Sequence, residues 1–148
     1  MNAPAASILV VDDEPDLRTL YELTLLREGY HVSTAATLQE AHEQLQTQRF
    51  DVVITDMRLP DGFGMELLHA LRDQQRPERC VVMTAYGSAE NAVEALRSGA
   101  FDYLTKPVDV GLLLDKLARI ASVIAAVRER QRNHVLLEQY RHLVDQSA

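Results

Sequence analysis

The segment Ile8–Glu14 reads ILVVDDE, in which four consecutive aliphatic residues are followed at once by three acids. A short apolar run that ends in polar residues is typical of a strand buried inside a sheet. The segment therefore predicts a buried first strand that carries carboxylates at its carboxyl end.

Four further apolar, β-branched runs alternate with stretches of helical periodicity. The runs are Tyr30–Ala35, Asp51–Thr55, Arg79–Thr84 and Phe101–Leu104. Apolar spacing, capping residues and glycine stops predict helices over about residues 15–28, 38–48, 65–74 and 88–98. This alternation favours a doubly wound α/β fold with a five-stranded parallel sheet. Right-handed crossovers allow the flavodoxin-like strand order 2-1-3-4-5.

Local sequence signals mark the starts of two of these helices and the position of one loop. Thr37, with Glu40 three residues later, forms a capping box that opens the second helix. Ser88 is expected to cap the fourth helix. The stretch after the third strand is predicted to be a loop because it gathers the turn-forming residues Pro60, Asp61, Gly62 and Gly64.

The pattern changes after Pro107, where apolar residues step by four, three, four and three positions through Leu113, Leu117, Ile120, Ile124 and Val127. Such spacing is the seam of a helix that pairs with another helix. A polar run at 128–134 interrupts the seam, which partly resumes at Leu136, Tyr140 and Leu143. We expect one long helix to about Val144. Its first two turns would cover the sheet, and its remainder would form a homodimer through Leu117, Ile120, Ile124 and Val127.

Length and composition limit the classes of protein to consider. The chain of 148 residues is 47% hydrophobic and 25% charged, which suits one globular domain. We expect a tail over residues 1–6, the domain over 7–120 and a helical linker or dimerisation segment over 121–148.

The net charge of −7 argues against nucleic-acid binding by this fragment, and the single Cys80 excludes an internal disulfide. With no apolar run near the roughly 20 residues that span a bilayer and no secretion signal, a cytoplasmic location is expected.

Three acids fall at the ends of predicted strands. Asp12 and Asp13 follow the first strand and Asp56 follows the third. The order 2-1-3-4-5 makes these strands neighbours, so the carboxylates meet at one edge of the sheet. Like charges that close need a counter-charge, and a hard cation with oxygen ligands such as Mg²⁺ supplies it. The alternative is that Asp12 and Asp13 cap the next helix and that Asp56 starts a turn.

Two more polar groups follow the next two strands. Thr84 ends the fourth strand and Lys106 follows the fifth, so both reach the same edge. A phosphoryl group on Asp56 would need a metal ion, a hydroxyl donor and a cation around its oxygens. The alternative is a strand-end threonine and a solvated lysine.

Four segments resemble the response-regulator receiver family: Val10–Glu14, Thr55–Gly62, Met83–Gly87 and Phe101–Pro107. The resemblance covers about residues 7–120 and implies the CheY-like form of the flavodoxin-like fold. It implies that Asp56 accepts a phosphoryl group from a sensor histidine kinase. It further implies that Asp12, Asp13, Asp56 and the Arg58 backbone carbonyl hold Mg²⁺, and that Thr84 and Lys106 bind the phosphoryl oxygens.

The resemblance also implies roles for residues beside the acids. Thr84 and the aromatic Tyr103 would form the conformational switch, and the Lys106–Pro107 peptide bond would be cis. Arg58 and Tyr86 lie two residues after Asp56 and Thr84, where we expect them to flank the phosphoryl group and tune its lifetime. The alternative is that both are only exposed loop residues.

A narrower resemblance, to receivers of the NtrC type, rests on Thr84–Ser88, Ala89–Ala95 and Gly99–Tyr103. In that family the receiver precedes an AAA+ ATPase that acts on sigma-54 RNA polymerase, and a DNA-binding helix-turn-helix module. The sequence has no G-x-x-x-x-G-K-[ST] loop. We therefore expect a regulatory fragment rather than an enzyme, in which phosphorylation changes dimer packing.

Three other functions would use parts of the same pattern. A haloacid-dehalogenase-like phosphatase also uses a strand-end aspartate and Mg²⁺, but it needs a second acid where this chain has Arg58. A flavodoxin-like FMN carrier needs a hydroxyl- or glycine-rich loop where this chain has Asp12, Asp13 and Glu14. A free-standing receiver that signals by protein contact alone stays open, although the long helical tail disfavours it.

Overall fold

The computed structural model describes residues 6–85 and 89–147, with side chains described as far as Asp145. Residues 1–5 of the predicted tail, Tyr86 and the predicted cap Ser88 lie outside the described residues. The chain forms two compact units that divide between Leu114 and Asp115. The first unit contains the sheet, and the second contains most of the last helix.

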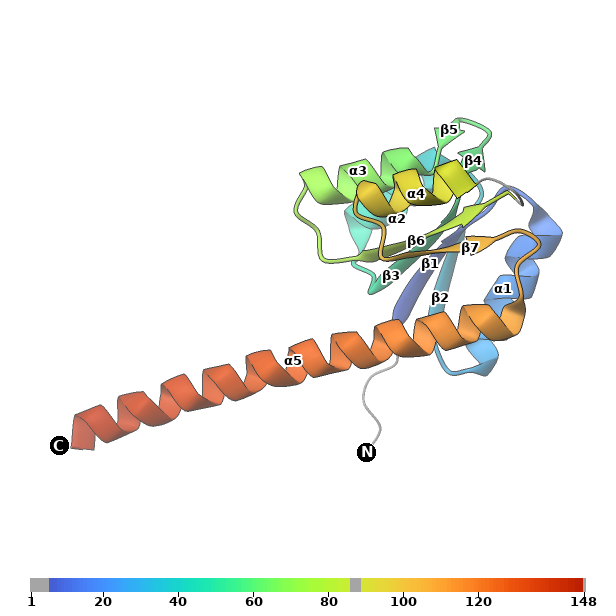
Figure 1. The fold of residues 1–148 in the computed structure, drawn as a ribbon. Coiled ribbons are helices and arrows are strands. Elements are labelled where there is room, and N and C mark those ends of the chain that lie inside the picture. The colour runs from blue at the N-terminus through green and yellow to red at the C-terminus, as the bar shows by residue number, and fades with distance from the viewer. Residues whose placement is uncertain (1–5, 86–88, 148) are drawn as a thin grey trace. The chain divides into compact units, whose positions relative to one another are not determined.

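Five parallel strands form the central sheet in the order β2-β1-β3-β6-β7 (Figure 1). They are β1 (Ser7–Val11), β2 (His31–Ala35), β3 (Val52–Asp56), β6 (Arg79–Thr84) and β7 (Asp102–Thr105). This is the predicted order 2-1-3-4-5, so the predicted fold class is confirmed. Within the register Val11 pairs with Thr55, and Asp56 pairs with Met83. The carboxyl ends of β1, β3 and β6 are therefore level with one another.

Helices of the first unit cover the two faces of this sheet. They are α1 (Pro15–Arg27), α2 (Leu38–Thr47), α3 (Met65–Asp73) and α4 (Ala89–Arg97), whereas α5 (Val110–Ser147) belongs mostly to the second unit. In Figure 1, α2, α3 and α4 lie on one face and α1 lies on the other. Leu9 and Val11 of β1 join residues of α2 and α3 in one apolar cluster. Ile8 and Val10, which alternate with them, are also fully buried, as the predicted first strand requires.

A two-stranded hairpin replaces the loop that was predicted after the third strand. Strands β4 (Arg58–Leu59) and β5 (Gly62–Phe63) pair antiparallel, Arg58 with Phe63 and Leu59 with Gly62. The turn residues correctly marked the chain reversal. The prediction of a loop was wrong because strands of two residues carry no periodic pattern.

Two local predictions have clear outcomes. The predicted N-cap of α2 is confirmed, since Thr37 Oγ1 accepts a hydrogen bond from the Glu40 amide at 3.1 Å. The returning bond of the predicted capping box is shifted by one residue, because Glu40 Oε2 accepts the amide of Ala36 at 2.6 Å rather than that of Thr37. The fifth strand begins and ends one residue later than predicted. Thr105 pairs with Thr84 and completes the strand, whereas Phe101 is left with 40% of its surface exposed.

The last helix, α5, has 38 residues, which confirms the predicted extended C-terminal helix. Leu113, Leu117, Ile120 and Ile124 are buried. The large apolar residues from Val127 onward are exposed. Among the described residues, no helix combines the length and the apolar character needed to cross a membrane.

A buried ion pair lies at the amino-terminal end of β6. Arg76 binds Glu78 through two hydrogen bonds, of 2.9 and 2.6 Å, and Glu78 Oε2 also accepts the Phe50 amide at 3.0 Å. Burial raises the pKa of Glu78, but these hydrogen bonds outweigh it and hold the pKa below its usual value of 4.5. The stabilisation from Glu78 is therefore present above that usual value and is lost as the pH falls through the lowered pKa.

Replacing Glu78 with alanine is expected to lower the free energy of unfolding by about 3 kcal/mol, because the Arg76 guanidinium and the Phe50 amide lose their buried acceptor. Urea unfolding measures the change. Arg72→Ala is the control, since Arg72 and Asp73 form a pair with 60% and 75% of their side-chain surfaces exposed. That change should cost less than about 0.5 kcal/mol. Equal losses in the two variants would contradict the role of the buried pair.

Candidate functional site

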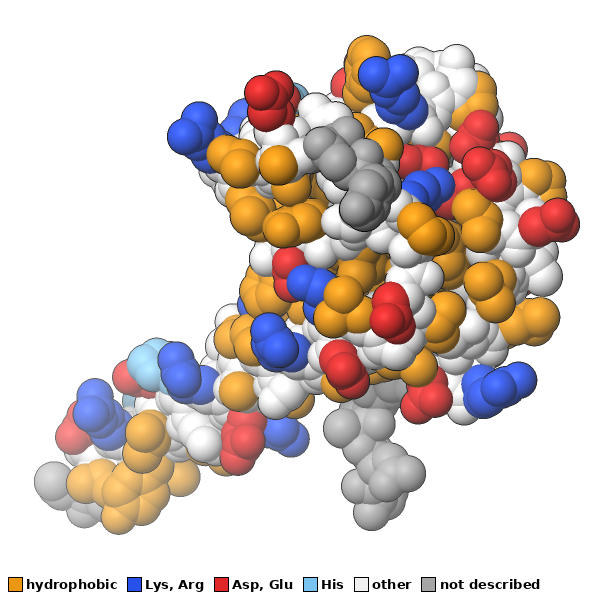
Figure 2. Space-filling model, turned by 45° about the vertical axis from the view of Figure 1, so that its right-hand side comes forward, with side chains coloured by type: hydrophobic (Ala, Val, Ile, Leu, Met, Phe, Trp, Pro, Cys, Tyr) orange, Lys and Arg blue, Asp and Glu red, His pale blue; other side chains and the backbone are white. Residues whose placement is uncertain are grey.

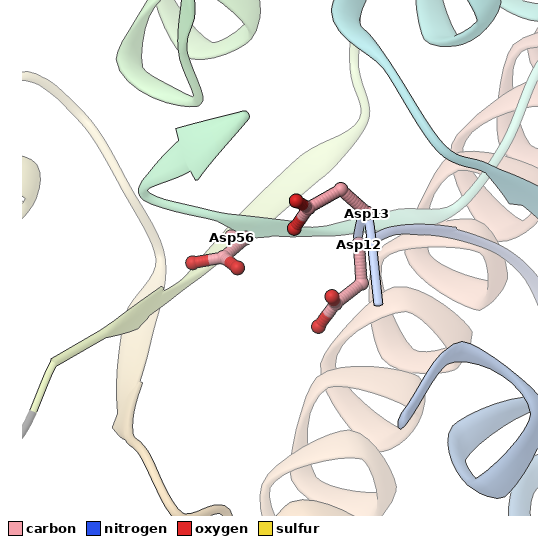
Figure 3. A group of neighbouring side chains, drawn as sticks. All are labelled: Asp12, Asp13 and Asp56. Atoms are coloured by element: carbon pink, nitrogen blue, oxygen red, sulfur yellow. The ribbon is translucent and has the colours of Figure 1, made fainter. Parts of the chain in front are cut away.

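Three carboxylates converge at the ends of two neighbouring strands. Asp12 and Asp13 directly follow β1, and Asp56 is the last residue of β3. An oxygen from each lies within 4.8 Å of an oxygen from the others, and Figure 3 shows the three side chains lying close together. Asp12 is fully buried, Asp56 is half-buried and Asp13 is exposed. The arrangement opens to solvent on the side of Asp13.

Hydrogen bonds hold Asp12 in place. Its Oδ1 accepts the Glu14 amide at 2.9 Å, and its own amide donates to the Ala35 carbonyl at 3.0 Å. Arg18 Nη1 donates to the Asp12 carbonyl at 2.7 Å. The bond from the Glu14 amide closes a local turn rather than capping α1, whose N-cap residue is Glu14 and has no side-chain capping bond. The other oxygen, Oδ2, faces the site.

Lys106 supplies the counter-charge. Its Nζ lies 2.7 Å from Asp56 Oδ2 and 3.2 Å from Asp12 Oδ2. The Lys106 amide donates to the Thr84 carbonyl at 2.7 Å, and the Lys106–Pro107 peptide bond is cis. Burial lowers the pKa of Lys106, but the two carboxylates outweigh this and raise the pKa above its ordinary value. The side chain is therefore an ammonium ion at neutral pH.

The other predicted site residues take different positions. Thr84, the last residue of β6, is buried, and its Oγ1 donates to the Leu104 carbonyl at 3.5 Å. Tyr103 is half-buried on β7, where it pairs with Val82. Arg58 is exposed in β4. The structure therefore brings Asp12, Asp13, Asp56 and Lys106 together.

Gly64 approaches Asp56 in a way that was not predicted from the sequence. The Gly64 amide donates to the Met57 carbonyl at 2.8 Å. A Cβ atom on Gly64 would collide with the Asp56 backbone carbonyl oxygen. In the sequence Gly64 is only one more glycine in a stretch of turn-forming residues. Its contact with Asp56 could not be predicted because it depends on the path of the hairpin.

The role of Asp61 was also not predicted. Its two carboxylate oxygens accept the Leu38 amide at 2.8 Å and the Gln39 amide at 3.0 Å. The hydrogen bond from Leu38 is the largest cause of a lowered pKa at Asp61. Its neighbours Pro60 and Gly62 marked a turn, but no local pattern connects that turn with a helix more than twenty residues earlier.

The donor set fits a small, hard cation. Mg²⁺ prefers carboxylate oxygens at about 2.1 Å, so two of its ligands lie at most about 4.2 Å apart. The carboxylate oxygens of Asp12, Asp13 and Asp56 lie within 4.8 Å of one another. Small rotations of these side chains would bring them to ligand spacing. The exposed side of Asp13 leaves room for the water molecules that Mg²⁺ retains.

The chain belongs to the response regulator receiver domain family, whose sequence profile matches residues 8–118. It is 50% identical over 111 residues to the response regulator protein PilR of Pseudomonas aeruginosa, an alignment that covers 74% of this chain and 25% of PilR. It is 39% identical over 109 residues to the transcriptional regulatory protein GlrR of Escherichia coli, with coverage of 74% and 24%. The chain spans about a quarter of the length of these curated relatives.

Solved receiver structures share the fold. The Francisella response regulator 1452 receiver domain superposes with a TM-score of 0.76 at 28% identity, over 80% of this chain and 98% of that one. The solution structure of the beryllofluoride-activated NtrC4 receiver domain dimer gives a TM-score of 0.72 at 33% identity, over 77% and 94%. These similarities agree with the strand order of the central sheet.

Lys106→Met is expected to lower the free energy of unfolding by about 2 kcal/mol in magnesium-free buffer, because it leaves the buried Asp12 and nearby Asp56 without their cation. Asp56→Asn should then stabilise the Lys106→Met protein by removing one of the three like charges at the site. In the wild-type background Asp56→Asn removes an attraction to Lys106 as well. Urea unfolding of the wild type, the two single variants and the double variant gives the coupling free energy between Lys106 and Asp56. An equal effect of Asp56→Asn in both backgrounds would contradict this account.

Proposed function

We propose that this chain is a two-component signalling receiver that accepts a phosphoryl group on Asp56 from a phosphohistidine of a sensor histidine kinase, in a Mg²⁺-dependent reaction. The observation that carries the proposal is the meeting of Asp12, Asp13 and Asp56 with the Lys106 ammonium at one end of the sheet. Membership of the receiver family supports it. The chain acts here as a regulatory phospho-acceptor rather than as an enzyme with its own substrate.

Each site residue has a part in this proposal. Asp12, Asp13, Asp56 and the Arg58 backbone carbonyl would hold Mg²⁺, which when bound neutralises charge on the incoming phosphoryl group. Lys106 already lies 2.7 Å from Asp56 Oδ2 and would bind a phosphoryl oxygen from the same side. Asp12 and Lys106 keep each other oriented while Asp56 attacks. The half-buried position of Asp56 leaves one side open to the donor.

Thr84 and Tyr103 would form the switch. In the unmodified chain the Thr84 hydroxyl donates to the carbonyl of Leu104, the residue next to Tyr103, over a long 3.5 Å. A phosphoryl group on Asp56 offers this hydroxyl a charged acceptor, which forms a stronger hydrogen bond than a carbonyl does. Moving the hydroxyl would free the Leu104 carbonyl and the space beside it, so that Tyr103 changes rotamer. Phosphorylation then shifts the population between two arrangements.

Arg58 and Tyr86 would flank the phosphoryl group and limit the access of water to it. The exposed side chain of Arg58 in β4 suits this role. Arg58 also stands where an aspartate-nucleophile phosphatase would need its second acid. The chain therefore suits slow dephosphorylation rather than turnover.

Intact-mass analysis after incubation with acetyl phosphate and Mg²⁺ should show one phosphoryl adduct. The adduct should be absent from Asp56→Asn, since the amide cannot form the acyl phosphate. Asp16→Asn is the matched control, because Asp16 is an exposed acid on α1 and should leave the adduct unchanged. Labelling of Asp56→Asn to the wild-type extent would place the phosphoryl group elsewhere and contradict the proposal.

For the output, we propose regulation of a sigma-54-type AAA+ transcription activator with a DNA-binding module. The similarity to PilR, a response regulator protein, and to GlrR, a transcriptional regulatory protein, supports this. Residues 7–120 would be the receiver and residues 121–148 the helical linker. The long helix α5 disfavours a free-standing receiver. A cytoplasmic location agrees with these roles.

We also propose a homodimer formed through α5, in which phosphorylation changes the packing. The predicted seam runs through Leu117, Ile120, Ile124 and Val127, of which Val127 is exposed and the other three are buried within the chain. The exposed apolar surface continues with Val135, Leu136, Leu137, Tyr140, Leu143 and Val144. Figure 2 shows apolar side chains gathered toward the C-terminal end of this helix. The NtrC4 receiver was solved as a beryllofluoride-activated dimer.

Val127→Asp should raise the dimer dissociation constant about tenfold or more, because it places a charge in an apolar seam. Sedimentation velocity of the unmodified and beryllofluoride-treated protein measures this. Ser122→Asp adds the same charge at an exposed position of the same helix outside the seam and should change little. Monomers at all concentrations, with and without beryllofluoride, would contradict the dimer.

A further inference from the structure

The hairpin β4–β5 is attached to α2 by one side chain. Asp61 lies in the turn between the two strands. Its Oδ1 accepts the Leu38 amide at 2.8 Å and its Oδ2 accepts the Gln39 amide at 3.0 Å. Leu38 and Gln39 are the first two residues of α2. A carboxylate at the amino terminus of a helix is favourable because the free amides there carry partial positive charge.

Asp61 and Thr37 divide the capping of α2 between them. Thr37 Oγ1 accepts the amide of Glu40, the third residue of the helix, at 3.1 Å. The first three amides of α2 are thus satisfied by side chains, two of them by Asp61. Thr37 serves the helix alone, whereas Asp61 joins the helix to the hairpin. This difference allows the two functions to be separated by mutation.

The tip of the hairpin rests directly on α2. Gly62 has a φ of +152°, a conformation that favours glycine, and a Cβ atom there would lie 2.7 Å from Leu38 Cδ1. Leu59 is buried in the same apolar cluster as Leu38. The tip therefore has close contact with α2 in addition to the hydrogen bonds of Asp61.

The base of the hairpin is fixed to the acidic site. Arg58 begins the hairpin two residues after Asp56, and its pairing with Phe63 leads the chain back to Gly64. Gly64 then packs against the Asp56 carbonyl and donates to the Met57 carbonyl at 2.8 Å. Displacement of the tip would thus be transmitted to the Arg58 carbonyl and to the backbone of Asp56.

We propose that Asp61 is a positioning residue for the acidic site: by binding the first two amides of α2 it holds the hairpin so that the Arg58 carbonyl and the Asp56 carboxylate share one metal ion. The inference rests on the proposed function, because it takes the Arg58 carbonyl as a ligand. Asp61 itself does not enter the site, and its effect passes through the hairpin backbone.

The test compares Asp61→Ala with Thr37→Ala. Mg²⁺ dissociation constants are measured by calorimetric titration of the full chain, and the free energy of unfolding is measured for each protein in urea without Mg²⁺. Asp61→Ala should weaken Mg²⁺ binding about tenfold or more, as loss of a residue that orients metal ligands does. Thr37→Ala also removes a cap of α2 but should leave the Mg²⁺ dissociation constant within about twofold of wild type, because the hydrogen bond that it removes lies within α2 and its cap.

Amide hydrogen exchange supplies a second measurement. In Asp61→Ala the amides of Gly64 and Phe63 should exchange faster while the strands of the central sheet keep their protection. Wild-type Mg²⁺ affinity in Asp61→Ala, or equal losses in both variants, would overturn the inference and leave the proposed function standing. Failure of the wild-type chain to bind Mg²⁺ would overturn the proposed function and this inference together.

Discussion

Three carboxylates repel one another at the ends of two neighbouring strands, and the arrangement of the surrounding residues follows from how that repulsion is offset. Asp12 is fully buried, so its charge requires a partner. The Lys106 ammonium bridges Asp12 and Asp56 at 3.2 and 2.7 Å. Because Lys106 follows the end of β7, the charge balance at β1 and β3 depends on a strand two places from β3 and three places from β1 in the sheet. Correct strand order is thus a condition for the site to exist.

The helix α2, beside the site, is held at both ends by side chains from distant parts of the chain. Asp61 accepts its first two amides, and Arg76 donates to the carbonyls of Leu45 and Gln48 at its other end. An acid at the amino terminus and a cation at the carboxyl terminus both suit the helix dipole. Glu78 in turn fixes Arg76. The segments before and after α3 therefore hold α2 between them.

These features differ in how far the sequence could predict them. The strands could be predicted because buried strands have a clear pattern, while their order was one that right-handed crossovers allow and that the family resemblance implied. Given that order, the meeting of Asp12, Asp13 and Asp56 follows, because parallel strands end at the same edge. The hairpin could not, since Arg58–Leu59 and Gly62–Phe63 are too short for a pattern. The contacts of Asp61 with α2 and of Gly64 with Asp56 depend on tertiary positions that no local spacing encodes.

The groups that would bind the phosphoryl oxygens also connect the site to one edge of the sheet. Thr84 and Lys106 are joined by a 2.7 Å hydrogen bond between their backbones, and the Thr84 hydroxyl donates to the Leu104 carbonyl of β7. β7 is an edge strand with β6 as its one neighbour in the sheet, so it has fewer restraints than the central strands. A pull on Thr84 or Lys106 toward Asp56 would therefore displace β7 more readily than β3. Helix α4 contacts both β6 and β7, so a displacement of β7 would also reach α4, whose Val93 and Leu96 are exposed.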